Sequence, residues 1–229
     1  MIIKDFNRRL LLKHRLKLKK AFNCNSDWYG NNYGGFFMNP DLLSKESIIY
    51  SFGIGEDISF DRSAITRHHC KVFGFDFTPR SIEWVSKQEL PATFEFHAYG
   101  IGITSGLITL YLPKNEKHVS GSIVDNTVVD PQNQIQVPIK SLSDITSDLG
   151  HTSIDVLKMD IEGAEYEVLP SILKSKIRIG QILIEFHHKL CRNGISKTKE
   201  MVSLLKDKGL ELFAISPSYS ELSFINKEI

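Results

Sequence analysis

The sequence predicts an α/β fold with an open, mostly parallel sheet. Apolar runs of strand length alternate with stretches of helical period, and the runs fall at residues 47–52, 71–75, 92–97, 154–159 and 181–186. The first run is followed by a glycine-rich turn and a helix, which form the opening unit of a Rossmann-like fold. Two more runs flank the turn-forming letters SPSYS and predict a closing hairpin, with an antiparallel strand at or inside the sheet edge.

The composition limits the function classes. The chain has 229 residues, of which 41% are hydrophobic and 24% charged, so it can bury the core of one α/β domain. A net charge of +1 gives no argument for a nucleic-acid partner. Cys24, Cys70 and Cys191 form no C-x-x-C pair, which fits a reducing compartment. No run reaches the ~18 apolar residues of a membrane span, and no secretory signal is recognisable, so we expect a cytoplasmic protein.

Residues 1–46 are expected to lead into a main domain at 47–229. Residues 1–22 predict a basic helix with a few apolar side chains, which could lie on an anionic membrane or on RNA. Docking of this helix on the domain, with a solvated basic face, is the favoured prediction. Residues 25–40 are dense in glycine, asparagine and aromatic residues and predict an irregular loop, whose rings either cover a ligand or pack in the core.

The glycine-rich turn contains Gly53 and Gly55, which would let the backbone approach a bound cofactor. The third glycine of a dinucleotide fingerprint is missing, because position 58 is Ile. Glu56 and Asp57 place negative charge where a pyrophosphate would need bare amides. The turn therefore suits a cofactor that carries positive charge.

The second strand ends on Asp76, 23 residues after Gly53. An acid near this spacing can accept hydrogen bonds from the ribose hydroxyls of an adenosine-containing ligand. Asp76 could equally cap the following helix, and the two roles can coexist. The third strand is followed by Tyr99 and Gly100, and residues 105–139 then predict a small β excursion over the carboxyl edge of the sheet.

The strand at 154–159 is followed by Asp160 and Glu162, at the edge where open α/β sheets bind ligands. Glu165 either joins this site or merely favours the positive end of the next helix. We expect Pro170 to break or restart that helix, because proline lacks the amide and clashes with the preceding turn.

The chain resembles the FkbM-like family of class I S-adenosylmethionine-dependent methyltransferases in four strings, YSFGIGEDISFD, FGFDFTPRSIEWV, LKMDIEGAEYEVL and ILIEFHH. The resemblance covers residues 28–190 and, with the closing hairpin, most of the chain. It implies a seven-stranded sheet whose last strand is antiparallel and S-adenosylmethionine as the cofactor. It also implies a methyl transfer, usually to oxygen, with a hydroxyl of a sugar or another small molecule as the acceptor.

The resemblance assigns roles to residues as well. The expected cofactor contacts are Phe52, Gly53, Gly55, Asp57, Asp76, Tyr99 and Gly100. Within this set, Gly53, Gly55 and Asp57 correspond to the methionine side and Asp76 to the ribose, whereas Asp160 and Glu162 would face the methyl group. Two positions depart from the usual pattern of class I enzymes: Ser51 replaces an acid, and no acid follows the third strand, so adenine would be held by backbone groups and stacking.

An alcohol acceptor is a poor nucleophile, and a base that takes its proton accelerates transfer by ~10²–10⁴. Asp160 is the first candidate for this base or for orienting the acceptor, and His187 is the second, with Glu162 beside them. These three residues and Glu185 could instead hold Mg²⁺, although we expect no metal.

Two other function classes stay open. The chain could be a non-catalytic binding module with a methyltransferase fold, tethered to membrane or RNA by its basic N-terminal helix. A nicotinamide-dependent oxidoreductase is disfavoured by the missing third glycine and by the closing hairpin.

Overall fold

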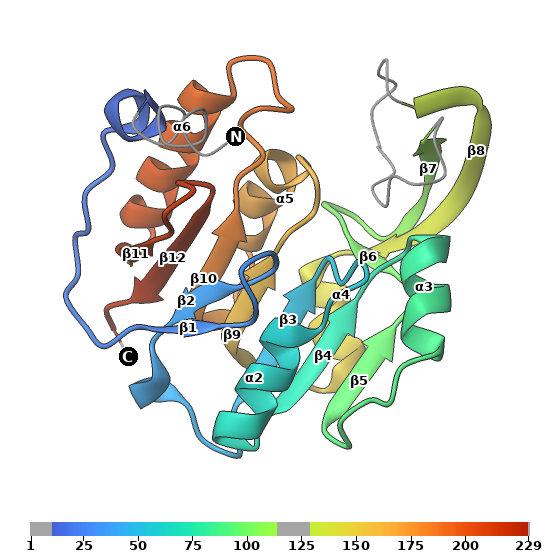
Figure 1. Ribbon diagram of the computed structural model, residues 1–229, viewed down its shortest axis with the longest axis horizontal. Helices are drawn as coiled ribbons and strands as arrows, with labels where there is room; N and C mark the ends of the chain where they lie inside the picture. The colour runs from blue at the N-terminus through green and yellow to red at the C-terminus, as the bar shows by residue number, and fades with distance from the viewer. Residues whose placement is uncertain (1–10, 114–128, 229) are drawn as a thin grey trace.

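The computed structural model describes residues 11–113 and 129–228 and contains a central seven-stranded sheet (Figure 1). The strands lie in the order β11-β12-β10-β9-β3-β4-β5. Their bounds are β3 Ile48–Phe52, β4 Lys71–Phe75, β5 Phe94–His97, β9 Ser153–Met159, β10 Arg178–Glu185, β11 Leu210–Ile215 and β12 Glu221–Asn226. Strand β12 pairs antiparallel with both β10 and β11, whereas the other pairs are parallel. The predicted α/β fold, with an antiparallel last strand inside the edge, is therefore confirmed.

Helices cover both faces of this sheet, as expected for strands with apolar side chains on both sides. They are α2 Ser59–His68, α3 Pro79–Ser86, α4 Leu142–Leu149, α5 Glu165–Ile172 and α6 Gly194–Asp207. The side chains of successive residues of β3 point to opposite faces of the sheet and belong to two different hydrophobic cores. Tyr50 packs with side chains of α4, α5 and α6, whereas Ile49 packs with side chains of α2 and α3.

Residues 25–40 do not form the predicted irregular loop. Strands β1 (Asp27–Tyr29) and β2 (Phe36–Met38) form a hairpin, which the short helix η1 (Pro40–Leu42) follows. Tyr29 at the end of β1 and Phe36 and Met38 in β2 are fully buried on the core beside α2. Alternating burial stabilises these strands, and the glycines that suggested a loop occupy the turn between them, with Asn31 and Asn32.

The N-terminal helix docks on the domain, as predicted, but it ends earlier than predicted. Helix is present at residues 11–16 and ends at Lys17, which has a left-handed φ of 54°. Leu12 and Leu16 are buried, and the following segment runs along the sheet edge, where the Ala21 amide donates to the Leu212 carbonyl at 2.7 Å. Residues 1–10 lie outside the described part of the chain, so a membrane contact through residues 1–22 stays a prediction.

The expected break at Pro170 is wrong. Pro170 lies inside α5, and the regular bonds continue on both sides, from the Val168 amide to the Ala164 carbonyl and from the Leu173 amide to the Leu169 carbonyl, both at 3.0 Å. Proline costs only one bond here, because it falls in the last turn of a short helix.

The β excursion is confirmed. Strands β6 (Gly100–Ile101), β7 (Gly106–Pro113) and β8 (Val129–Lys140) form a separate three-stranded sheet in the order β6-β8-β7. It follows β5 and projects from the carboxyl-end side of the main sheet (Figure 1). In the described ranges, no helix has the length and apolar character needed to cross a bilayer.

Candidate active site

The glycine loop, residues 53–55, leaves β3 at the carboxyl edge of the sheet. Gly53 and Gly55 have left-handed φ values of 79° and 56°. A Cβ added to Gly53 would lie 1.6 Å from the carbonyl oxygen of Asp160, whereas a Cβ added to Gly55 would meet nothing within 4 Å. Only glycine therefore permits the close approach of this loop to the end of β9, and the other end of the loop faces open space.

Lys158 supports the glycine loop from below, a role that the sequence reasoning missed. Its Nζ donates to the Gly53 carbonyl at 2.6 Å, and the residue is only 5% exposed. Asp61 of α2 is also buried; burial raises the pKa of its carboxyl, and the charge of Lys158 opposes that rise. A lysine inside an otherwise apolar strand was the sequence signal for this role.

Asp76, the predicted ribose acid, holds the glycine loop in place. One carboxylate oxygen accepts from the amides of Ile54 and Gly55 at 3.0 and 2.9 Å. The other accepts from the amide and the hydroxyl of Thr78, both at 2.8 Å. The N-cap of α3 is Thr78 rather than Asp76, so the capping alternative is wrong by two residues. A contact of Asp76 with a ribose stays a prediction.

Asp57, predicted on the methionine side, joins the loop to the β1–β2 hairpin. Its carboxylate accepts from the Ser59 amide at 2.8 Å, which satisfies a free donor at the start of α2. It also accepts from the Asn31 side chain at 2.8 Å, in the hairpin turn. This tie brings the hairpin to the rim of the glycine loop.

Among the other expected cofactor contacts, Phe52 is a core residue. Its side chain is 1% exposed and stacks on Phe75 at 4.5 Å between ring centroids, so only its backbone is available to a ligand. Tyr99 also packs against Phe75, and the Lys140 ammonium lies 4.6 Å from its ring centroid. Gly100 begins β6 and is buried. No cofactor contact of these residues is tested by the structure.

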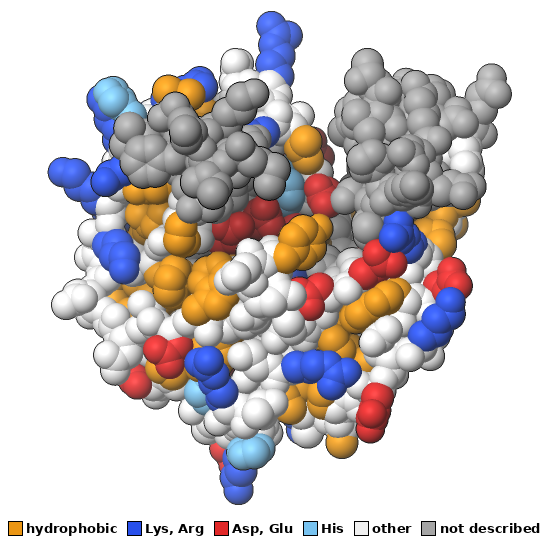
Figure 2. Space-filling view, in the orientation of Figure 1, with side chains coloured by type: hydrophobic (Ala, Val, Ile, Leu, Met, Phe, Trp, Pro, Cys, Tyr) orange, Lys and Arg blue, Asp and Glu red, His pale blue; other side chains and the backbone are white. Residues whose placement is uncertain are grey.

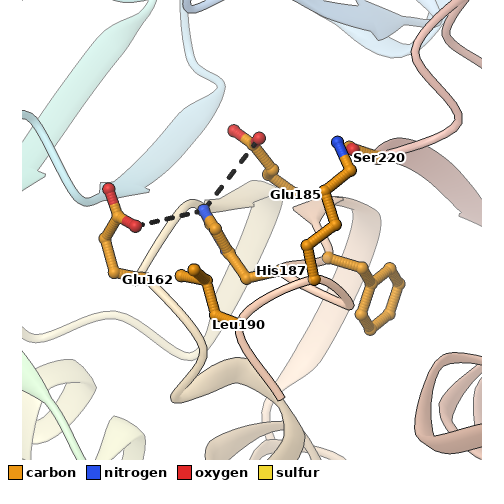
Figure 3. Close-up of a pocket in the computed structure, with 7 residues that line it drawn as sticks. Glu162, Glu185, His187, Leu190 and Ser220 are labelled. Atoms are coloured by element: carbon orange, nitrogen blue, oxygen red, sulfur yellow. Dashed lines mark ion pairs between the residues drawn. The ribbon is translucent and has the colours of Figure 1, made fainter. Parts of the chain in front are cut away.

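Four functional groups converge beside the glycine loop, and we call them the acid–histidine cluster: Asp160, Glu162, Glu185 and His187. Asp160 and Glu162 follow β9, whereas Glu185 is the last residue of β10 and His187 follows it; the carboxyl ends of the two strands are adjacent in the sheet. His187 Nε2 lies 3.4 Å from Glu162, 3.6 Å from Asp160 and 4.0 Å from Glu185. Figure 2 shows acidic side chains gathered beside a histidine on this face, and Figure 3 shows His187 between Glu162 and Glu185. The predicted catalytic residues therefore meet at one place.

Glu165 fixes the orientation of His187, and the sequence left its role open. It is fully buried at the start of α5, and one carboxylate oxygen lies 2.6 Å from the donating His187 amide and 3.2 Å from His187 Nδ1. Its other oxygen accepts from the Gly163 amide at 2.8 Å. With Nδ1 hydrogen-bonded to Glu165, His187 turns Nε2 toward the three acids.

The crowding of like charges sets the electrostatics of this cluster. Burial, followed by the negative charge of Asp160, raises the pKa of Glu185 to about 8. Burial is also the main cause that raises the pKa of Asp160. Burial alone would lower the pKa of His187, but its hydrogen bond to Glu165 and the surrounding acids raise it to about 9. The cluster therefore retains protons at neutral pH and favours any cation placed beside it.

The sequence comparison decides the family. A model of the methyltransferase FkbM domain matches residues 22–212. The chain belongs to this family. The membership confirms the expected methyl donor, because FkbM methyltransferases depend on S-adenosylmethionine.

The individual relatives share about a quarter of their aligned residues with this chain. The FkbM chain is 24% identical to methyltransferase-like protein 24 of Homo sapiens over 205 residues, which are 85% of this chain and 50% of that protein. It is 26% identical to the Rattus norvegicus protein of the same name over 226 residues, which are 93% of this chain and 53% of that protein. The chain thus spans about half the length of these curated relatives.

Two solved structures are among those that resemble the fold. Fibrillarin of Methanococcus jannaschii, a pre-rRNA processing protein, has a TM-score of 0.46 and 12% identity, covering 92% of this chain and 86% of that one. Human N-acetylserotonin methyltransferase in complex with S-adenosylmethionine has a TM-score of 0.39 and 11% identity, covering 80% of this chain and 47% of that one.

The residues of this FkbM domain fit a positively charged methyl donor. The glycine loop is open above Gly55, and its other end touches the backbone of Asp160, whose side chain belongs to the acid–histidine cluster. Beside the cluster lies an open pocket of about 210 Å³, lined by Glu162, Glu185, Phe186, His187, Lys189, Leu190 and Ser220. Loop, acids and pocket therefore lie next to one another at the carboxyl edge of the sheet.

Proposed function

We propose that this FkbM methyltransferase methylates a hydroxyl oxygen on a sugar or another small molecule. The observation that carries the proposal is the acid–histidine cluster, which stands between the glycine loop and an open pocket. A hydroxyl acceptor needs a proton acceptor at this position, whereas a stronger nucleophile does not. The pocket combines acidic groups with the exposed side chain of Leu190, which suits a ligand with both polar and apolar parts.

The chain's own residues would do three things in this reaction. Bound S-adenosylmethionine supplies an electrophilic methyl group on a positively charged sulfur. Asp160 would take the proton of the acceptor hydroxyl and so make its oxygen nucleophilic toward the methyl group that the donor would supply. His187, held by Glu165, hydrogen-bonds the acceptor and balances the negative charge of the acids.

The environment of Asp160 supports its role as the base. An ordinary aspartate is a weak proton acceptor at neutral pH, and a general base works best when its pKa lies near the working pH. Burial raises the pKa of Asp160 in that direction. Its carboxylate also lies directly after β9, on a rigid part of the sheet.

The test is a methyl-transfer assay with labelled S-adenosylmethionine and acceptor panels that carry hydroxyl, amine or carboxyl groups. We expect transfer to hydroxyl acceptors, with turnover reduced by ~10²–10⁴ in Asp160→Asn. The control Asp207→Asn makes the same change on the exposed surface of α6 and should leave turnover unchanged. Transfer only to amines, or full turnover in Asp160→Asn, would contradict the proposal.

The same experiment separates this function from a non-catalytic binding module. Calorimetry would detect S-adenosylmethionine binding in both cases, but only the enzyme would label an acceptor. The hydroxyl acceptor as partner and a cytoplasmic location stay predictions.

A further inference from the structure

We propose that Asp160, Glu185 and His187 bind a divalent metal ion of the Mn²⁺ or Zn²⁺ class. Two carboxylate oxygens and the imidazole Nε2 are available, and the three potential ligand atoms lie within 4.8 Å of one another. Ligands about 2.1 Å from an ion on opposite sides lie about 4.2 Å apart, so small side-chain rotations would complete the geometry. A mixed set of one imidazole and two carboxylates favours a transition-metal ion over Ca²⁺.

The support of His187 is the second observation. Histidines that bind a metal usually donate their other ring N–H to a carboxylate, which fixes the tautomer and the direction of the free nitrogen. Glu165 provides this carboxylate at 3.2 Å from Nδ1 and also accepts from the His187 backbone amide. Glu165 is fully buried and lies outside the ligand set, so it would orient His187 without binding the ion itself.

The unmet charge of the two carboxylates is the third observation. The side chains of Asp160 and Glu185 are each 26% exposed, so most of their hydration is lost. Within residues 11–113 and 129–228, no hydrogen-bond donor reaches either carboxylate. The cation within ion-pair distance of them is His187, whose Nε2 lies 3.6 Å from Asp160 and 4.0 Å from Glu185. Largely buried carboxylates are normally hydrogen-bonded, paired with a cation or bound to a metal. Lys158 also acts on Asp160 by its charge, but its Nζ donates to the Gly53 carbonyl. A divalent ion would place positive charge in direct contact with both carboxylates.

The position of the ion would matter for the acceptor. Glu185 and His187 also line the pocket, so an ion that they hold would face it and could bind an acceptor hydroxyl. This role, unlike the binding itself, rests on the proposed function. Glu162, with 43% of its side chain accessible, lies outside the ligand set and would remain beside the ion.

Metal binding can be measured without any acceptor. The full chain is stripped with a chelator, dialysed and titrated with Mn²⁺, and free Mn²⁺ is followed by its electron paramagnetic resonance signal. We expect one saturable site per chain, weakened at least tenfold in Glu185→Gln and unchanged in Glu200→Gln, which makes the same substitution on the exposed face of α6. Glu165→Gln should weaken binding 10–100-fold through His187, as typical for such supporting partners.

Circular dichroism and urea unfolding check that each variant is folded. Absence of saturable Mn²⁺ binding in the wild type, or equal binding in Glu185→Gln, would overturn the inference. Calorimetry with S-adenosylmethionine and the transfer assay are run on the same samples. Full transfer in the presence of chelator, without Mn²⁺ binding, would refute the metal site alone. Saturable Mn²⁺ binding without transfer to hydroxyl acceptors would uphold the site and refute the proposed function.

Discussion

Asp76 and Asp160 end the two strands that flank β3, and their surroundings are opposite. The carboxylate of Asp76 accepts four hydrogen bonds from Ile54, Gly55 and Thr78. Asp160 has the acids Glu162 and Glu165 as neighbours, with His187 3.6 Å away and the charge of Lys158 acting on it as well. Both acids stand at the edge where ligands bind in such folds. The difference teaches that Asp76 completes the protein's own structure through hydrogen bonds, whereas Asp160 accepts no side-chain or amide hydrogen bond from the described residues and stays open to a ligand.

The strongest test of this contrast is Asp76→Ala. Four donors would lose their acceptor, and bonds to a charged group contribute ~1.5–3 kcal/mol each but not additively, so we expect the free energy of unfolding to fall by about 3–4 kcal/mol. Urea unfolding measures it, with Asp207→Ala as the control on exposed α6. An unchanged midpoint would show that Asp76 is not a structural support of the glycine loop.

Glu165→Gln sharpens the contrast, because the Glu165 carboxylate is fully hydrogen-bonded although it lies beside the acid–histidine cluster. The amide keeps one acceptor oxygen but places an NH₂ group against an amide or ring donor. We expect a loss of about 2 kcal/mol in the free energy of unfolding, measured in urea. A loss below that of an exposed Glu→Gln change at Glu200 would contradict the assigned role.

Thr78→Val probes a single bond to Asp76. The substitution removes only the hydroxyl that donates to Asp76 and leaves the Thr78 amide in place. One bond to a charged acceptor predicts a loss of about 1.5 kcal/mol, which thermal unfolding would detect as a lower Tm. A loss as large as that of Asp76→Ala would mean that the effect is not specific to this bond.

Glu185→Gln should have the smallest effect and the opposite sign. Its carboxyl has a pKa raised from 4.5 to about 8, so above pH 4.5 its ionisation is harder in the folded than in the unfolded chain and destabilises the fold. In chelator, the variant should therefore be more stable than wild type by about 1 kcal/mol at pH 8, with the gain vanishing near pH 4. Unfolding curves across this range measure it; a gain that grows on acidification would refute the contrast.

Some local features were predictable because they depend on neighbours in sequence. The strand periods, the glycine loop and the acids that follow β9 can each be recognised in a window of a few residues. The β1–β2 hairpin was missed because Tyr29, Phe36 and Met38 form strands only through burial against α2 and the sheet. Pro170 was misjudged for a related reason, since the packing of α5 tolerates one missing bond near its end.

The sequence by itself determined the α/β class, the family and which acids stand at strand ends, because period, spacing and strings of residues carry these properties. Only the tertiary structure decided which acid is satisfied. Ile54 and Gly55 reach Asp76 because the β3 and β4 ends are neighbours, and Glu165 holds His187 because α5 packs beside the end of β10. Hydrogen bonds and charge repulsion depend on distances of a few ångströms between segments far apart in the chain, and such distances exist only after folding.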